Sequence, residues 1–157
     1  MTRVGITGHQ QLPAEAIPYI RQQIRIILAE LPPPVEGFSS LADGADQLFA
    51  RILIELGGRL HAVIPSENYE STFDDSSLAQ YRKLREQASG IEQLPFAEPD
   101  EAAYDAAGRR VVENSDILLA VWDGKPARGR GGTADAVAYA RAQHLRVLVI
   151  WPAGVDR

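Results

Sequence analysis

Hydrophobic residues follow two alternating patterns along the chain. Short apolar runs, which are typical of buried β-strands, cover residues 3–7, 35–41, 60–64, 91–96, 116–122 and 146–151. Between these runs, apolar residues recur every three or four positions, which predicts helices over residues 17–31, 45–56, 78–89, 100–114 and 133–144. Residues 66–75 have no dependable period and predict a loop.

Strands that alternate with helices predict an α/β fold. Because several of the strands are apolar throughout, helices should cover both faces of a mainly parallel sheet. We therefore predict a three-layer, doubly wound, Rossmann-like α/β fold. The 157 residues show no linker and no internal repeat, so we expect a single domain over residues 1–157. In such folds, ligands bind beyond the carboxyl ends of the strands, near the point where the strand order reverses.

The composition excludes several classes of protein. Hydrophobic residues make up 45% of the chain, enough for a buried core, and no apolar run reaches the roughly 18 residues of a membrane span. The absence of cysteine excludes disulfides, thiolate metal sites and thiol nucleophiles. Three scattered histidines make no metal site of ordinary spacing, so we expect neither a metal nor another cofactor. With no signal peptide before the first strand, we expect a cytoplasmic protein.

The net charge bears on the choice of partner. The chain has 16 basic and 21 acidic residues, a formal net charge of -5. It therefore lacks the bulk positive charge and the continuous basic stripe with which many proteins bind nucleic acid. We expect a small-molecule nucleotide as the partner, and we do not expect nucleic acid or a membrane.

Unusual residues collect directly after the predicted strands, at the edge where a ligand should bind. The candidates for ligand contact are Thr7, Gly8 and His9 after the first strand, Ala42, Gly44, Ala45 and Asp46 after the second, and Trp122, Asp123, Gly124, Arg130, Gly131, Gly132 and Thr133 after the fifth. Because the carboxyl ends of parallel strands share one edge of a sheet, these turns predict a single composite site.

The loop after the fifth strand is typical of an anion site. Gly131 and Gly132 precede Thr133, which opens a helix, so free backbone N–H groups and the positive end of the helix dipole should face a ligand. Lys125 and Arg130 add positive charge. A phosphate seat is one interpretation of this loop, and a solvated surface loop with a helix cap is the other.

The turn after the second strand also has two interpretations. In one, Asp43 caps the following helix and Asp46 is its partner in a capping-box arrangement. In the other, the backbone N–H groups of Gly44 and Ala45 contact a ligand while Asp46 binds a ribose hydroxyl.

Three aromatic or imidazole side chains near the predicted edge leave similar alternatives. His9 is either a structural hydrogen-bonding residue or a catalyst, and Trp122 or Tyr69 either stacks on a base or completes the core. The sequence contains no phosphate-binding P-loop, nucleophile elbow or G-x-G-x-x-G motif. A conventional nucleoside triphosphatase or NAD dehydrogenase is therefore disfavoured.

Four segments, in this order, resemble one superfamily of nucleotide-binding domains. They are residues 4–9 (VGITGH), 40–46 (SLADGAD), 115–124 (SDILLAVWDG) and 131–140 (GGTADAVAYA). Together they resemble the SLOG superfamily, which includes the lonely-guy phosphoribohydrolases (the "lysine decarboxylase-like" proteins) and the DNA-processing protein A domain. The resemblance covers about residues 4–152 and implies a Rossmann-like fold, a nucleotide ligand and a homodimer.

The chain departs from the phosphoribohydrolases at their catalytic position. In that family, a catalytic Glu stands three residues after the Thr of a Pro-Gly-Gly-x-Gly-Thr motif. Here that position is Ala136, and the nearest acid is Asp135, which is rotated by about 100° on a helix. We therefore expect nucleotide binding through the phosphate seat. The alternative is an N-glycosidic hydrolase or transferase that acts on a nucleoside 5'-monophosphate, with Asp135 as its candidate catalytic acid. DNA binding is a third hypothesis, which the net charge opposes.

Overall fold

The computed structural model describes residues 1–126 and 132–157, and within them it contains one six-stranded sheet. The strands are β1 (Thr2–Gly8), β2 (Val35–Ser39), β3 (Arg59–Ile64), β4 (Gly90–Gln93), β5 (Ile117–Val121) and β6 (Arg146–Ile150). Each pair of neighbours runs parallel, in the order β4-β3-β2-β1-β5-β6. The predicted α/β fold with a parallel sheet is confirmed.

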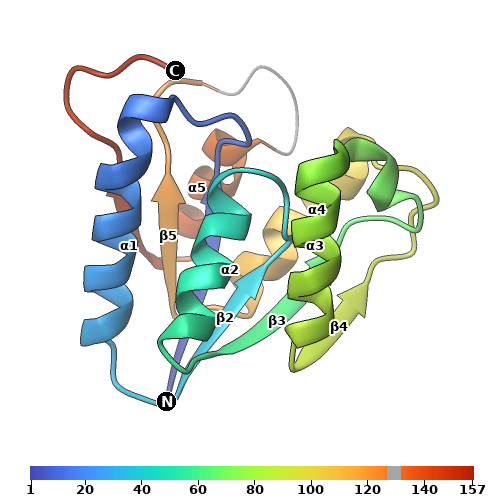
Figure 1. Ribbon diagram of the computed structural model, residues 1–157, viewed down its shortest axis with the longest axis horizontal. Coiled ribbons are helices and arrows are strands. Elements are labelled where there is room, and N and C mark those ends of the chain that lie inside the picture. Colours follow the sequence, from blue (N-terminus) through green and yellow to red (C-terminus); the bar gives the residue numbers. More distant parts are fainter. Residues whose placement is uncertain (127–131) are drawn as a thin grey trace.

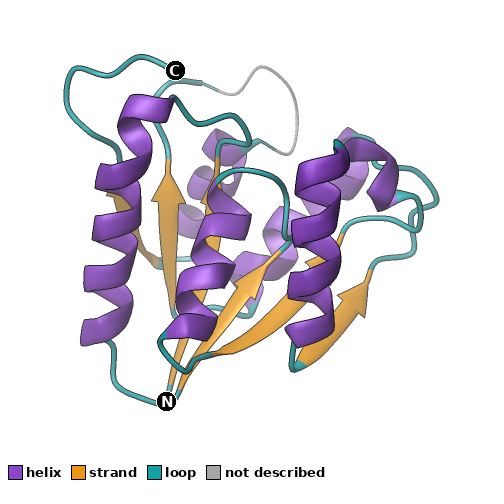
Figure 2. Cartoon of the chain, viewed as in Figure 1, coloured by secondary structure: helices purple, strands orange, loops and turns teal. Residues whose placement is uncertain are grey.

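Helices cover both faces of the sheet, as a doubly wound fold requires. The α-helices of the described residues are α1 (Ile17–Glu30), α2 (Ala45–Glu55), α3 (Asp75–Gln87), α4 (Glu101–Glu113) and α5 (Thr133–Ala142). Helices α1, α2 and α3 lie on one face of the sheet, and α4 and α5 lie on the other (Figure 1, Figure 2). Among the described residues, no helix combines the length and the apolar character that crossing a bilayer would require.

Side-chain capping explains why α3 begins earlier than the predicted residue 78. Helix α3 starts at Asp75 because Oδ1 of Asp74 accepts the N–H of Ser77 at 2.8 Å, and Oγ of Ser77 accepts the N–H of Asp74 at 3.1 Å. Periodicity does not register this polar cap, so it places the start of α3 too late. At α4 the prediction was accurate, because the helix begins at Glu101 and Oδ1 of Asp100 caps it by accepting the N–H of Ala103.

Two segments depart from their predicted conformations. Strand β2 ends at Ser39, because Leu41 adopts a φ of 58°, outside the range of a strand. The predicted loop over residues 66–75 contains a single-turn helix, η2 (Tyr69–Thr72). Another single-turn helix, η1 (Ala14–Ala16), lies elsewhere in the chain and precedes α1. Helix η2 buries Tyr69 in the core, which an irregular loop on the surface would not do.

The strand order reverses at β1, which lies between β2 and β5. Helix α1 follows β1 on one face of the sheet, and α5 follows β5 on the other face (Figure 1). In doubly wound folds, this arrangement leaves a crevice at the carboxyl edge of the sheet. Every residue of β5 is buried, so this crevice rests directly on the hydrophobic core.

Candidate functional site

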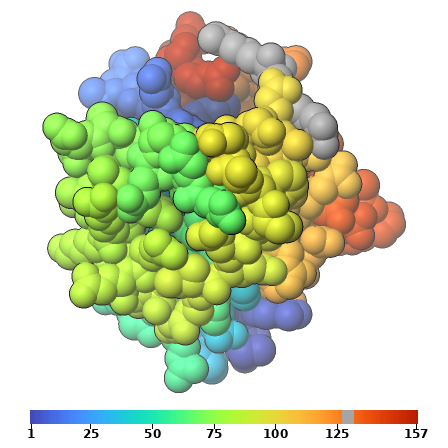
Figure 3. Space-filling model, turned by 90° about the vertical axis from the view of Figure 1, so that its right-hand side faces the viewer, coloured from blue at the N-terminus to red at the C-terminus, as the bar shows by residue number. Residues whose placement is uncertain are grey.

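A cavity of about 580 Å³ opens at the carboxyl edge of the sheet. Its lining comes from the turns after β1 and β2, from η2, from α4, from the loop after β5 with the start of α5, and from Arg157. Figure 3 shows that the last residues, in red, lie beside the first turn of the chain, in blue, at this end of the molecule. The cavity thus lies where the strand order reverses.

The structure brings together many of the residues predicted to contact a ligand. Those that line the cavity are Thr7, Gly8, His9, Ala42, Asp46, Trp122, Gly132 and Thr133. Gly44, Ala45, Asp123 and Gly124 are outside this lining, although they belong to the same turns. Arg130 and Gly131 lie outside the described residues, so the predicted phosphate seat is described only from Gly132 onward.

The N–H groups of Gly44 and Ala45 are used within the chain. The Ala45 N–H donates to the carbonyl oxygen of His9 at 3.2 Å, and the Gly44 N–H donates to Oδ1 of Asp43 at 2.8 Å. Gly44 is the N-cap residue of α2 and has a φ of 83°, so Asp43 does not cap this helix as the sequence suggested. Instead of presenting these amides to a ligand, the turn after β2 binds the turn after β1 and fixes the wall of the cavity.

Asp135 is outside the lining of the cavity. It borders a small depression between α4 and α5 that adjoins the cavity, because Tyr104, Gly108 and Gly132 line both. Ala136, which occupies the position of the catalytic Glu of the phosphoribohydrolases, is buried beside Gly108 of α4. The predicted catalytic acid thus lies next to the cavity without being part of its lining.

Asp46 is the one acidic residue in the cavity lining that the structure describes. Its side chain is buried at the start of α2, and Oδ2 accepts the N–H of Ala42 at 3.3 Å. Burial raises the pKa of Asp46 to about 7, although backbone hydrogen bonds from Ala42 and Ser40 oppose the shift. Near neutral pH this carboxyl group is therefore present in both its ionised and its neutral form.

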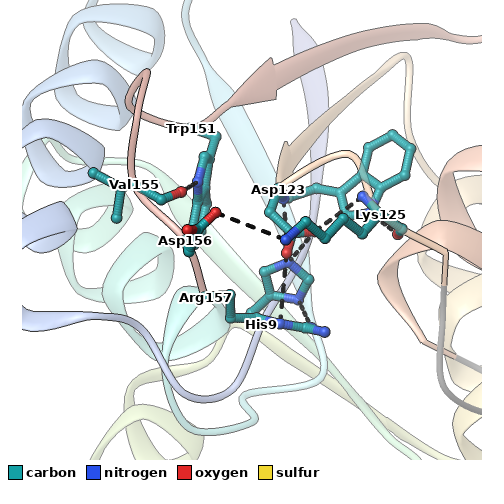
Figure 4. Close-up of polar contacts among 8 residues, drawn as sticks. His9, Asp123, Lys125, Trp151, Val155, Asp156 and Arg157 are labelled. Atoms are coloured by element: carbon teal, nitrogen blue, oxygen red, sulfur yellow. Dashed lines mark hydrogen bonds and ion pairs between the residues drawn. The ribbon is translucent and has the colours of Figure 1, made fainter.

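A polar cluster of three residues flanks the cavity (Figure 4). Nε2 of His9 lies 3.3 Å from Oδ1 of Asp123 and 3.2 Å from the backbone nitrogen of the same residue. The guanidinium of Arg157 approaches both partners, with Nη1 2.7 Å from Nδ1 of His9 and Nε 3.7 Å from Oδ2 of Asp123. The edge of the His9 ring also meets Trp151, with ring centroids 5.5 Å apart.

The pKa values in this cluster follow from burial and charge. Burial lowers the pKa of His9, and the positive charge of Arg157 lowers it further, against the opposing effect of Asp123. For Asp123, burial raises the pKa, but the hydrogen bond from the Lys125 N–H and the charges of His9 and Arg157 outweigh it and hold the pKa below its ordinary value. Asp123 is thus a carboxylate at neutral pH.

Sequence reasoning missed Arg157. The segment after β6 folds back because Nε1 of Trp151 donates to the carbonyl oxygen of Val155 at 2.8 Å, and Nζ of Lys125 lies 3.8 Å from Oδ1 of Asp156 (Figure 4). These contacts carry Arg157 to the cavity, where it joins Lys125. The sequence did contain a signal for Arg157, because this residue follows the last predicted strand and so lies at the same edge of the sheet as the other turns.

The described lining of the cavity contains two kinds of polar group. The start of α5 (Gly132 and Thr133), which follows β5, and the cations Lys125 and Arg157 suit an anion. Asp46 and Tyr69, which follow β2 and β3, offer hydrogen-bonding groups. In the described residues, no group of three or more His, Asp or Glu side chains is arranged to hold a metal ion.

Comparisons with known proteins place the fold. No protein-family model matches the sequence, and no curated protein matches it significantly. The structure is similar to DNA processing protein A (DprA) from Streptococcus pneumoniae, with 18% identity and a TM-score of 0.73, over 99% of this chain and 52% of that chain. DprA from Helicobacter pylori gives 18% identity and a TM-score of 0.68, over 94% of this chain and 64% of that chain. The X-ray structure of a protein called TM1055 is also similar, with 18% identity and a TM-score of 0.60, over 94% of this chain and 72% of that chain.

These similarities overturn one expectation drawn from the sequence. We did not expect a nucleic-acid partner, but the H. pylori protein, which shares this fold, binds single-stranded DNA. Net charge averages over the whole surface, whereas binding depends on local groups such as the cations of one cavity. The chain spans about half the length of the S. pneumoniae protein, so the likeness concerns one fold within that protein. The chain has the Rossmann-like fold that these proteins share.

Proposed function

We propose that this chain binds a nucleotide at the carboxyl edge of its sheet, with the phosphate at the start of α5. The observation that carries the proposal is a single cavity whose lining joins Gly132 and Thr133 to Lys125 and Arg157. The N–H groups of a first helical turn have no partner within the helix, so they stabilise an anion together with the helix dipole. Two neighbouring cations strengthen the same preference.

The size and position of the cavity support a nucleotide ligand. Its volume of about 580 Å³ lies within the range of roughly 300–1,000 Å³ that small-molecule sites occupy. It also lies where doubly wound folds bind nucleotides, at the reversal of the strand order. DprA and TM1055 share this fold, which agrees with a nucleotide-related role.

Single-stranded DNA is the second candidate ligand. The similarity to H. pylori DprA favours it, because a strand presents the same phosphate and base groups as a free nucleotide. The two candidates differ in their dependence on salt, since a strand that contacts several cations releases several counterions. Affinity for an oligonucleotide should fall steeply with salt, whereas affinity for a mononucleotide should fall weakly.

Calorimetric titration with nucleoside monophosphates, and fluorescence anisotropy with a labelled oligonucleotide, test the proposal. We expect Lys125→Ala and Arg157→Ala each to weaken binding about tenfold, the value of one charge-assisted hydrogen bond. Arg146→Ala is the matched control, because Arg146 starts β6 at the opposite edge of the sheet and is exposed. Equal losses in all three variants would reject the assigned site.

The same samples test the alternative of N-glycosidic cleavage. Chromatography after incubation with each nucleoside monophosphate would detect released base. Release would identify an enzyme, and Asp46 would then be the first carboxyl group to substitute, because it lines the cavity. If Asp135→Asn alone abolished release, the catalytic group would be Asp135 in the adjoining depression and not Asp46.

A further inference from the structure

An unpartnered hydroxyl group lies in the wall of the cavity far from α5. Tyr69 lines the cavity with only 2% of its surface exposed, and its hydroxyl group has no hydrogen-bond partner among the described residues. Leaving a buried hydroxyl group unpaired costs stability, so such groups normally have a partner. Because Tyr69 belongs to the cavity lining, a ligand bound there would supply the missing partner.

The ring of Tyr69 is held in place by other aromatic side chains. Its centroid lies 5.1 Å from that of Phe73, 5.5 Å from that of Tyr81 and 6.3 Å from that of Tyr104, all in edge-to-face contact. Three such contacts restrict rotation of the ring, so the hydroxyl group cannot swing away to find another partner. Its direction is set before any ligand arrives.

Asp46 lies close enough to Tyr69 for the two groups to interact. After burial, the charge of Asp46 is the largest cause of the raised pKa of the Tyr69 hydroxyl group. Oδ2 of Asp46 accepts the N–H of Ala42, and no hydrogen bond joins Asp46 to Tyr69 among the described residues. The carboxyl group of Asp46, an acceptor, and the hydroxyl group of Tyr69, a donor, thus lie near each other in the cavity lining without a hydrogen bond between them.

The strand order indicates which part of a nucleotide would reach this wall. Gly132 and Thr133 follow β5, whereas Asp46 follows β2 and Tyr69 follows β3. In the order β5-β1-β2-β3, these residues are two and three strands away from the phosphate seat, roughly 10 and 14 Å along the edge. The sugar of a nucleotide is bonded to its phosphate and would lie near β1. The base is the next group, and it would extend to β2 and β3.

We propose that Asp46 and Tyr69 form a nucleobase subsite, in which the Asp46 carboxyl group accepts an N–H of the base edge and the Tyr69 hydroxyl group donates to an adjacent ring nitrogen or carbonyl oxygen. This inference rests on the proposed phosphate seat. It assigns Asp46 to the base, whereas the sequence alone suggested a ribose hydroxyl group. The matching ligand class is a nucleotide with an intact base, and a sugar phosphate would lack the group that pairs with this wall.

Tyr69→Phe is the decisive variant, because it removes only a hydroxyl group that bonds nothing described in the chain. Tyr81→Phe is its matched control, since Tyr81 belongs to the same aromatic cluster and is outside the cavity lining. The probes are ribose 5-phosphate and the four common nucleoside 5'-monophosphates, titrated by calorimetry. Chemical denaturation of each variant verifies that it folds.

We expect the wild-type protein to bind at least one monophosphate at least tenfold more tightly than ribose 5-phosphate. The affinity of Tyr69→Phe for that nucleotide should be about tenfold lower than that of the wild-type protein, and its affinity for ribose 5-phosphate should be unchanged. Tyr81→Phe should bind both probes as tightly as the wild-type protein does. Asp46→Asn should change which base binds best, because an amide offers a donor where the carboxylate accepts.

The outcomes separate this inference from the proposed function. If ribose 5-phosphate binds and no monophosphate binds more tightly, the phosphate seat stands and the base subsite is rejected. The subsite is also rejected if Tyr69→Phe binds its nucleotide as well as the wild-type protein does. If none of the probes binds, both proposals are wrong.

Discussion

Nη1 of Arg157 lies 2.7 Å from Nδ1 of His9, although 148 residues separate the two along the chain. A guanidinium group can only donate, so Nδ1 must be the acceptor in this hydrogen bond. Nε2 faces two partners of opposite character, because the backbone N–H of Asp123 donates to it at 3.2 Å and the carboxylate oxygen Oδ1 of the same residue lies 3.3 Å away. Contacts at both ring nitrogens, with residues distant in sequence, thus fix the direction of the ring.

We predict that His9 is neutral at pH 7, because its pKa is lowered. Nitrogen NMR of the labelled imidazole distinguishes the two tautomers and gives the pKa. Arg157→Ala should raise the pKa of His9, because the charge of Arg157 lowers it. A doubly protonated ring at pH 7 in the wild-type protein would contradict the assignment.

The lowered pKa of His9 also affects stability. As the pH falls below about 6.5, the unfolded chain binds a proton at this residue before the folded chain does. The free energy of unfolding should therefore decrease between that pH and the lower pKa of the folded state. His9→Gln should remove this part of the pH dependence, which urea denaturation at several pH values can measure.

Asp46 should have the opposite effect in a different pH range. Its pKa is raised from 3.8 to about 7, so the folded chain retains a proton that the unfolded chain has lost. The free energy of unfolding should therefore fall as the pH rises from about 4 to about 7, by up to about 4 kcal/mol for this shift. Asp46→Asn should be more stable than the wild-type protein at pH 8 and lack this decline. A difference between the two proteins that does not vary with pH would contradict the raised pKa.

Gly44→Ala should be strongly destabilising. Gly44 has a φ of 83°, and a Cβ atom there would lie 2.2 Å from the carbonyl oxygen of Gln10. Gly57 has a φ of 84° with nothing within 4 Å of such an atom, so Gly57→Ala is the control for backbone strain. We expect a loss of about 1 kcal/mol for Gly57→Ala and about 3 kcal/mol or more for Gly44→Ala. Similar losses would show that the two turns are not in close contact.

Gly108→Ala should stabilise the protein. Gly108 lies inside α4, and a Cβ atom would meet only the Cβ of Ala136, at an ordinary contact distance of 3.8 Å. Alanine favours a helix interior over glycine by about 0.5–1 kcal/mol, so thermal denaturation should show a higher midpoint. A lower midpoint would mean that α4 and α5 approach each other more closely than in this structure.

The strands and helices could be predicted because their signals are local. The apolar run at residues 117–121 and the helical spacing at residues 17–30 each determine an element without reference to the rest of the chain. The glycine-rich turns also indicated the edge of the sheet at which the cavity opens, since parallel strands end together. The pattern did not predict the helix ends that depend on polar caps, such as the start of α3 at the N-cap residue Asp74.

The details of the cavity wall could not be predicted, because they depend on contacts between distant segments. Nothing near Ala45 in the sequence indicates that its N–H binds the carbonyl oxygen of His9. Arg157 reaches the cavity only because Trp151 and Val155 turn the chain back. Tyr104 belongs to the cavity lining because α4 packs on the face of the sheet opposite α1. The position of α4 depends on the strand order, which is a property of the whole fold.

The pairing of β1 with β5 has a consequence for how ligand binding and folding are linked. It joins Val4 to Ile117, a contact of long range in sequence, so closing it costs much chain entropy and slows folding. The cavity is built at the ends of these two strands and therefore exists only after the pairing has formed. A ligand of this cavity would bind the fully folded chain alone, so its binding energy adds to the free energy of global unfolding. In a hydrogen-exchange experiment, the amides at the centre of the sheet would then gain protection as the ligand concentration rises.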